Sequence, residues 1–158
     1  ILSSLSVFNF VDSFSIHKVL PSTLTIIAKK TKFLGITIID GNKFYIGANE
    51  KLIPVSQVKE VQNLPFVFGK FQISEFLNLQ QILIKQSIDA KKISKYFYHK
   101  SKRWDLEFNN GVVLMLPYKN ISHSIKLYKI LDESNKINKN DILDLRIPNN
   151  IVLTNEEK

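Results

Sequence analysis

The dipeptide Asn110-Gly111 constrains the fold of this chain more than any other short segment. It joins an alternating run at residues 103–108 to an apolar run at 112–116, and an Asn-Gly step between two such runs is the strongest local signal for a β-hairpin. Another alternating run at 92–99 precedes this hairpin, and Pro117 ends it because proline cannot donate to a strand ladder. These residues therefore predict neighbouring strands of one sheet.

Helical spacing of apolar residues predicts two helices around these strands. The first runs from Ser74, the expected N-cap, to about Gln86, with Ile73 as a hydrophobic staple before the cap. The second runs from Asn120 or Ser122 to Ser134. The apolar positions of the first helix are Phe76, Leu77, Leu83 and Ile84, and those of the second are Ile121, Ile125, Tyr128 and Leu131.

The N-terminal part is predicted to consist mainly of strands. Residues 1–14 have the three-residue apolar spacing that suits the end of an amphipathic helix. Residues 14–19 and 23–28 alternate around Pro21-Ser22 and predict a hairpin. The segment 40–43, Asp-Gly-Asn-Lys, predicts a tight turn between two strands. The other ranges expected to be strands are 33–39, 44–46, 142–147 and 151–154.

The resulting order is strands, helix, strands, helix, strands. Two helices are too few for a regular parallel α/β fold, so the predicted class is α+β, a mostly antiparallel β-domain with both helices packed on the sheet. A chain of 158 residues with 44% hydrophobic and 23% charged residues is long and apolar enough for one well-packed core and a small second unit. It contains no run of about 20 apolar residues that could span a bilayer.

The sequence contains none of the residue groupings on which common catalytic or cofactor sites depend. His17, His99 and His123 lie in different predicted elements and form no chelating pair. Gly35 and Gly41 are isolated and lack the Lys-Ser/Thr pair of a phosphate loop. The absence of cysteine excludes disulfides and thiolate sites. We therefore expect no enzyme, no catalytic residue, no cofactor and no metal site.

The net charge of +8 suggests a polyanion partner as an alternative. Almost all of this charge is lysine, which fits an AT-rich coding bias, and only Arg103 and Arg146 offer a planar guanidinium. The lysine clusters at 91–95 and 100–103 flank Tyr-Phe-Tyr at 96–98. Aromatic residues among lysines can stack on single-stranded nucleic acid, but alternate aromatics of a strand also face the core. A basic nucleic-acid-binding module thus remains an alternative function.

Several motifs follow one another in a defined order along the chain. They are residues 18–26 (KVLPSTLTI), 39–41 (IDG), 64–69 (LPFVFG), 103–106 (RWDL), Asn110-Gly111, Leu116-Pro117 and 144–146 (DLR). Together they resemble the FtsQ/DivIB family of bacterial cell-division proteins, from about residue 11 to 154. The segment 30–32 (KTK) departs from this pattern, because the family usually has Glu-Arg-x-Pro there.

The resemblance implies a domain organisation. Residues 1–33 correspond to the C-terminal part of a POTRA-like domain, 34–154 to an FtsQ-like β-domain, and 155–158 to a polar tail. It also implies the periplasmic part of a single-pass inner-membrane protein located at the division septum. The membrane anchor is then expected upstream of Ile1, and it is the only expected contact with the membrane.

The resemblance further implies a non-catalytic scaffold of the divisome that binds FtsB- and FtsL-like proteins and other divisome members, and no nucleic acid. Such binding fits an exposed last strand, to which a partner segment can add as a further strand. Arg146 is expected to clamp a partner carboxylate, or else to pair with Asp144 or Asp141. A POTRA-bearing assembly or secretion protein is another alternative. The predicted partner contacts are Arg146, Ile147, Asn149, Ile151, Val152, Leu153 and Thr154.

Overall fold

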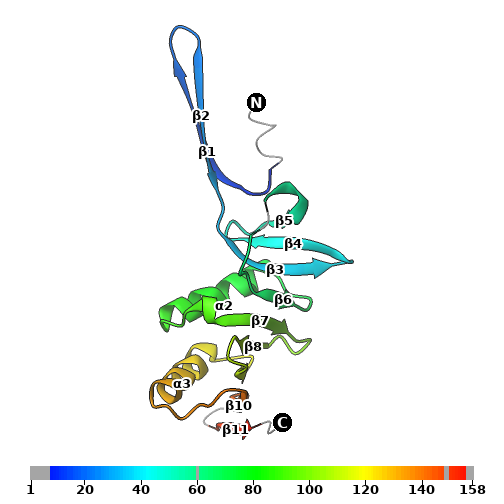
Figure 1. The fold of residues 1–158 in the computed structure, drawn as a ribbon, viewed down its shortest axis with the longest axis vertical. Coiled ribbons are helices and arrows are strands. Elements are labelled where there is room, and N and C mark those ends of the chain that lie inside the picture. The colour runs from blue at the N-terminus through cyan, green and yellow to red at the C-terminus, as the bar shows by residue number, and fades with distance from the viewer. Residues whose placement is uncertain (1–7, 60, 148–149, 156–158) are drawn as a thin grey trace. The chain divides into compact units, whose positions relative to one another are not determined.

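A computed structural model of the chain describes residues 8–59, 61–147 and 150–155. These residues belong to two compact units, Ile1–Gln62 and Asn63–Lys158 (Figure 1). The elements follow the predicted order of strands, helix, strands, helix, strands, with short 3-10 turns between some of them. Among the described residues, most strand pairs are antiparallel and the two α-helices belong to the second unit, so the prediction of an α+β fold is confirmed.

The first described strands of the first unit form a two-stranded antiparallel hairpin of β1 (Val11–Val19) and β2 (Thr23–Lys30). The predicted hairpin is confirmed, and both strands extend further from the turn than the predicted ranges 14–19 and 23–28. The helix expected over 1–14 is wrong for residues 11–14, because Val11 pairs with Lys30 and Phe14 with Ala28. Residues 1–7 of that prediction lie outside the described residues.

Three further strands complete the first unit. The strands β3 and β4 form the second predicted hairpin, and their turn consists of Asp40 and Gly41, with φ values of 48° and 78°. Positive φ at both central residues is the geometry that two-residue hairpin turns require. The strands are β3 (Phe33–Ile39), β4 (Asn42–Gly47) and β5 (Leu52–Pro54).

The second unit is one sheet with two helices, in which the strand order is β11-β10-β9-β8-β7-β6. The pairs β6–β7 and β9–β10 are parallel, and the remaining pairs are antiparallel. Each parallel pair is connected through a helix (Figure 1). The elements are β6 (Phe66–Phe68), α2 (Ile73–Lys85), β7 (Ile93–Tyr98), β8 (Trp104–Phe108), β9 (Val113–Met115), α3 (Ile121–Glu133), β10 (Asp141–Asp144) and β11 (Val152–Asn155).

The helices cover one row of buried side chains that crosses the sheet. Tyr96, Leu106 and Leu114 are opposite one another on β7, β8 and β9, and Leu143 of β10 lies opposite Leu114. Residues that are directly opposite share a face of the sheet. Each of these side chains is at most 1% exposed. Trp104 is 3% exposed and packs with its ring centroid 4.7 Å from that of Tyr98, which makes it a core residue.

The start of α2 differs from its prediction. Gln72, and not Ser74, is the N-cap, because the Glu75 side chain accepts a hydrogen bond from the Gln72 backbone N–H at 2.9 Å. Phe76 and Leu83 face the core as predicted, but Ile84 is 68% exposed and Leu79 is buried in its stead. Helical geometry explains this, since Phe76, Leu79 and Leu83 share one face at spacings of three and four.

The second helix has the predicted extent. It begins directly after Asn120, which has a left-handed backbone with φ of 60°, and ends before Ser134. Its buried residues are Ser124, Ile125 and Tyr128. The final strands are shorter or shifted relative to their predictions: β10 ends at Asp144, and β11 includes Asn155, the first residue of the predicted polar tail.

The second unit repeats one arrangement. Both β6-α2-β7-β8 and β9-α3-β10-β11 consist of a parallel pair joined by a helix, followed by an antiparallel strand. The two helices have the same length, and each begins with Ile-Ser directly after its N-cap. Leu79 and Leu127 then occupy the same position in their helices. This repetition allows the two halves to be compared position by position.

Candidate partner-binding site

The strand β11 forms one edge of the sheet in the second unit. It pairs with β10 through Leu143–Leu153 and Asp144–Val152, and no described strand pairs with its other side. In an antiparallel edge strand, alternate residues direct their backbone N–H and C=O groups away from the neighbouring strand. The outer side of β11 therefore presents hydrogen-bonding groups that a further strand could use.

Most of the predicted partner contacts lie around this edge. Val152 and Leu153 are 52% and 46% exposed on β11, where Thr154 is also exposed. Ile147 and Ile151 are 59% and 40% exposed in the connection that leads from β10 to β11. Asn149 lies outside the described residues. Four exposed apolar side chains, those of Ile147, Ile151, Val152 and Leu153, therefore lie on or beside the edge strand.

Arg146 follows β10 and is paired within the chain. Its Nε lies 2.8 Å from Oδ1 of Asp144, and its Nη2 lies 2.5 Å from Oδ2. These hydrogen bonds hold the pKa of the Asp144 carboxyl below its ordinary value and raise the pKa of Arg146. Of the two intramolecular pairings considered for Arg146, the one with Asp144 is present. Its contact with a partner stays a prediction.

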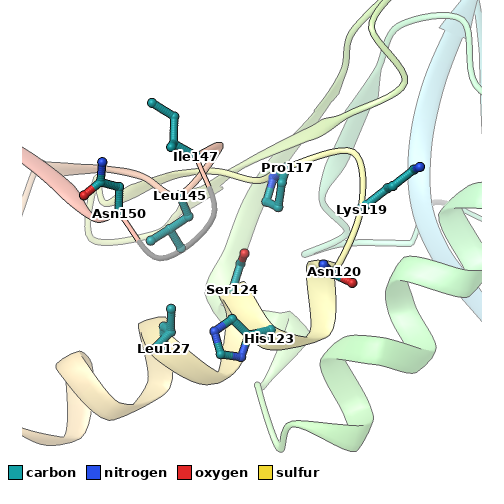
Figure 2. A pocket seen from close by; sticks show the side chains of 9 residues that line it. All are labelled: Pro117, Lys119, Asn120, His123, Ser124, Leu127, Leu145, Ile147 and Asn150. Carbon is teal, nitrogen blue, oxygen red and sulfur yellow. The ribbon is translucent and has the colours of Figure 1, made fainter.

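A pocket of about 170 Å³ lies beside the first turn of α3 (Figure 2). Its walls come from the β9–α3 loop, the first turns of α3 and the connection after β10, and include Pro117, Ser124, Leu127, Leu145 and Ile147. Sequence reasoning missed this pocket. The available signal was the pair of segments Ile-Ser-Glu-Phe at 73–76 and Ile-Ser-His-Ser at 121–124, in which a large apolar residue is replaced by serine.

The histidines occupy separate surroundings, as the sequence predicts. His17 is exposed on β1, His99 lies with Nε2 2.6 Å from Oδ2 of Asp105, and His123 borders the pocket. Within the described ranges, no three His, Cys, Asp or Glu side chains gather as metal ligands do. No helix in the described part of the chain has the length and apolarity to cross a membrane.

Comparison with known families gives a match that covers most of the helices and strands of the chain. The model of "Cell division protein FtsQ/DivIB, C-terminal" matches residues 37–146. This range contains both helices and all strands from β4 to β10, and it is more than half of the 158 residues.

Curated relatives agree with this match. The cell division protein FtsQ of Rhizobium meliloti (strain 1021) is 21% identical over 140 residues, which are 87% of this chain and 45% of that protein. FtsQ of Rhizobium radiobacter and FtsQ of Agrobacterium fabrum (strain C58 / ATCC 33970) are each 24% identical over 140 residues, 87% of this chain and 67% and 44% of their own lengths. The chain thus spans less than half of two of these relatives.

A solved structure also resembles the chain. It is the major extracytoplasmic domain of the trans isomer of the cell division protein DivIB from Geobacillus stearothermophilus, with a TM-score of 0.46 and 13% identity. The similarity covers 68% of this chain and 97% of that domain. On the extent of the family match, together with the ordered motifs from residues 39–41 to 144–146, the chain belongs to the FtsQ/DivIB family of cell division proteins.

Proposed function

We propose that this chain is a non-catalytic scaffold of the divisome that binds an FtsB- or FtsL-type partner by strand addition at β11. The open outer edge of β11 is the observation that carries the proposal. A partner segment in extended conformation would form backbone hydrogen bonds along this edge, and pockets for its alternate side chains would supply specificity. The family's role in cell division defines the class of partner.

The internal repetition of the second unit supports an antiparallel addition. In the first half, the outer edge of β8 is covered by β9, which pairs with it through Asp105–Met115 and Leu106–Leu114. The strand β11 occupies the position of β8 in the second half, but no described strand covers it. The added partner strand would therefore take the place that β9 takes beside β8.

The two faces of β11 would place different side chains beside those of the added strand. Leu153 lies opposite the fully buried Leu143 and therefore extends the apolar row under the helices. Val152 and Thr154 lie on the opposite face, because successive strand residues alternate. An apolar partner residue would thus pair with Leu153, while Arg146 at the end of β10 would attract a carboxylate.

We further propose that residues 1–33 belong to a POTRA-like unit and that the chain acts at the periplasmic side of the septal membrane. The hairpin β1–β2 supports this assignment, because Phe14, Ile16, Leu24 and Ile26 share one face and Ile26 is still 41% exposed. An isolated two-stranded hairpin is marginally stable in water. The apolar face would be covered by the remainder of the POTRA-like unit, and a longer natural sequence should protect its amides from hydrogen exchange.

Truncation tests the strand-addition mechanism most directly. Binding of an FtsB/FtsL-type partner complex would be measured by calorimetry with the intact chain and with a chain ending before Asn149. We expect the truncated chain to lose binding while it keeps its circular dichroism spectrum, because β11 contributes few core residues. Ile84→Ala, on the exposed face of α2, is the control and should bind normally. Equal binding by the intact and truncated chains would refute the mechanism.

The salt dependence of binding separates this function from the nucleic-acid alternative. A protein that contacts about 6–10 phosphates loses roughly 10³–10⁵ in affinity between about 50 and 200 mM salt. Strand addition depends on backbone hydrogen bonds and apolar contacts, so we expect partner affinity to change less than tenfold over this range. The fully buried Tyr96, in the aromatic segment between the lysine clusters, is also unable to stack on a base.

A further inference from the structure

In the first half of the second unit, a carboxylate lies between the start of the helix and the end of a strand. Oε2 of Glu75 accepts the backbone N–H of Gln72 at 2.9 Å, and Oε1 accepts the hydroxyl of Tyr98 at 2.6 Å. The next residue, Phe76, is fully buried. The carboxylate of Glu75 therefore satisfies the N–H of Gln72 and places a negative charge at the positive end of the helix dipole, while Phe76 fills the space beside the first turn.

The equivalent positions of α3 hold neither group. Counted from the N-caps Gln72 and Asn120, the third residue is His123 instead of glutamate and the fourth is Ser124 instead of phenylalanine. The first turn of α3 has no acidic residue, and the Asn120 side chain makes no capping hydrogen bond. The pocket lies beside His123 and Ser124 and is bordered by Leu145, which follows β10. The residue equivalent to Leu145 in the first half is Tyr98, at the end of β7.

Ser124 gives independent evidence that the pocket accepts a polar ligand. The residue is only 5% exposed, and its hydroxyl makes no hydrogen bond with another described residue. Figure 2 shows this hydroxyl directed away from the helix, toward the space between Pro117 and Leu145. The hydroxyl opens to the pocket and is not among the fully buried polar atoms that lack a partner, so it can donate its hydrogen bond to a ligand bound there.

The geometry points to a carboxylate-binding site at the start of α3, whose occupant is an acidic side chain of the partner segment that adds to β11. This assignment rests on the proposed function. The ligand would supply from outside what Glu75 supplies to α2, a negative charge at the helix N-terminus, and it would accept hydrogen bonds from free N–H groups there and from the hydroxyl of Ser124. Lys119, just before the helix, adds positive charge at the rim.

The apolar walls select a carboxylate on a methylene stem over a bare phosphate. Leu127 and Leu145 line the pocket, and a volume of about 170 Å³ suits a single side chain. The location also fits a segment bound at β11, because Ile147 and Asn150 of the β10–β11 connection border the pocket. A segment paired with Val152 would bring its flanking residues to this connection.

Two capped amino acids test the carboxylate preference without any partner. N-acetyl-glutamate methylamide and its glutamine analogue would be titrated into the intact chain while amide chemical shifts are followed by NMR. We expect saturable shifts at residues 121–124 with the glutamate compound, at least tenfold weaker effects with glutamine, and loss of the response in Ser124→Ala. Ser74→Ala, an exposed serine in the first turn of α2, should respond like the intact chain. Equal responses to both compounds would overturn the site.

A second measurement tests the occupant. His123→Glu places a carboxylate at the position in α3 that Glu75 has in α2, so this carboxylate should occupy the site and lower the affinity for the FtsB/FtsL-type partner about tenfold. Ser122→Glu makes the same charge change in the same turn outside the pocket, and should lower the affinity less than threefold. Equal affinities of His123→Glu and the intact chain would rule out the acidic occupant. Failure of the strand-addition function would be recognised separately, because truncation before Asn149 would then leave partner binding unchanged.

Discussion

Asp144 and Arg146 form a two-pronged ion pair at the point where β10 ends. One carboxylate oxygen accepts Nε at 2.8 Å, the other accepts Nη2 at 2.5 Å, and the backbone N–H of Arg146 donates to Oδ1 at 3.0 Å. The last of these bonds is a local side-chain turn that competes with strand pairing. It explains why β10 stops at Asp144, although the sequence predicted a strand as far as residue 147.

Replacement of Arg146 by glutamine should raise the pKa of Asp144 toward the ordinary value of about 4. The pair holds the pKa of Asp144 low, so its contribution to stability is present above the ordinary pKa and is lost as the pH falls through the lowered pKa. Carboxyl NMR titration of the intact chain and Arg146→Gln measures this directly. Lys129→Gln, which loses only the pair with Glu133, should leave the Asp144 titration unchanged.

Loss of the Glu75 carboxylate should destabilise the second unit by about 1–3 kcal/mol, because it leaves the Tyr98 hydroxyl and the Gln72 N–H without their acceptor. Burial and then the bond to Glu75 raise the pKa of Tyr98 to about 12. Stability from Tyr98 is therefore present below pH about 10 and is lost as the pH rises to about 12. Urea unfolding and tyrosine NMR of Glu75→Ala test both effects.

The control for this change is Glu133→Ala, which removes a carboxylate from a more exposed pair on α3. Its effect should stay within about 0.5 kcal/mol. A Tyr98 titration that is unaltered in Glu75→Ala would contradict the role of the carboxylate.

Two adjacent leucine-sized residues of α2 should differ sharply when they are truncated. Leu83 is 1% exposed and faces the sheet, whereas Ile84 is 68% exposed. Leu83→Ala should cost about 2–5 kcal/mol because it leaves a cavity, and Ile84→Ala should change stability by less than about 0.5 kcal/mol. Urea unfolding midpoints of the two variants provide the comparison, and similar midpoints would show that α2 does not pack as described.

Gly69 and Gly41 should respond differently to alanine. Both have positive φ, 105° and 78°, so either substitution strains the backbone by about 1–2 kcal/mol. A Cβ at Gly69 would also meet the backbone carbonyl oxygen of Tyr98, while a Cβ at Gly41 would meet nothing within 4 Å. Thermal unfolding should therefore show a clearly larger loss for Gly69→Ala. Equal losses would mean that the β6–α2 loop can move away from β7.

Local patterns were sufficient for the elements that are long or joined by tight turns. Asn110-Gly111 located the hairpin of β8 and β9, and helical spacing located α2 and α3. The strands β5 and β6 were missed, because each has only three residues and lies at a proline. Pro54 is the last residue of β5, and Pro65 directly precedes β6. Three residues are too short for alternation to be recognised, and the parallel pairing of β6 with β7 is decided by how α2 packs.

The candidate site was predicted only in part, for a comparable reason. Val152, Leu153 and Thr154 could be named from the resemblance to the FtsQ/DivIB family together with the predicted strand at 151–154. The pocket depends on the size difference between Ser124 and Phe76 at equivalent helix positions. The Ile-Ser pairs at 73–74 and 121–122 are a weak sequence signal of that equivalence, and the matching strand order and pairing of the two halves establish it.

The repeated β-α-β-β arrangement also bears on how the second unit folds and opens. Each parallel pair is closed through its own helix over a short stretch of chain, so little loop-closure entropy is lost in forming either half, and folding can start in both. The strand β11 is held on one side only, and its amides should exchange with solvent through the smallest opening free energy of the sheet. A partner bound there would then act as a clamp that slows exchange along the whole second half.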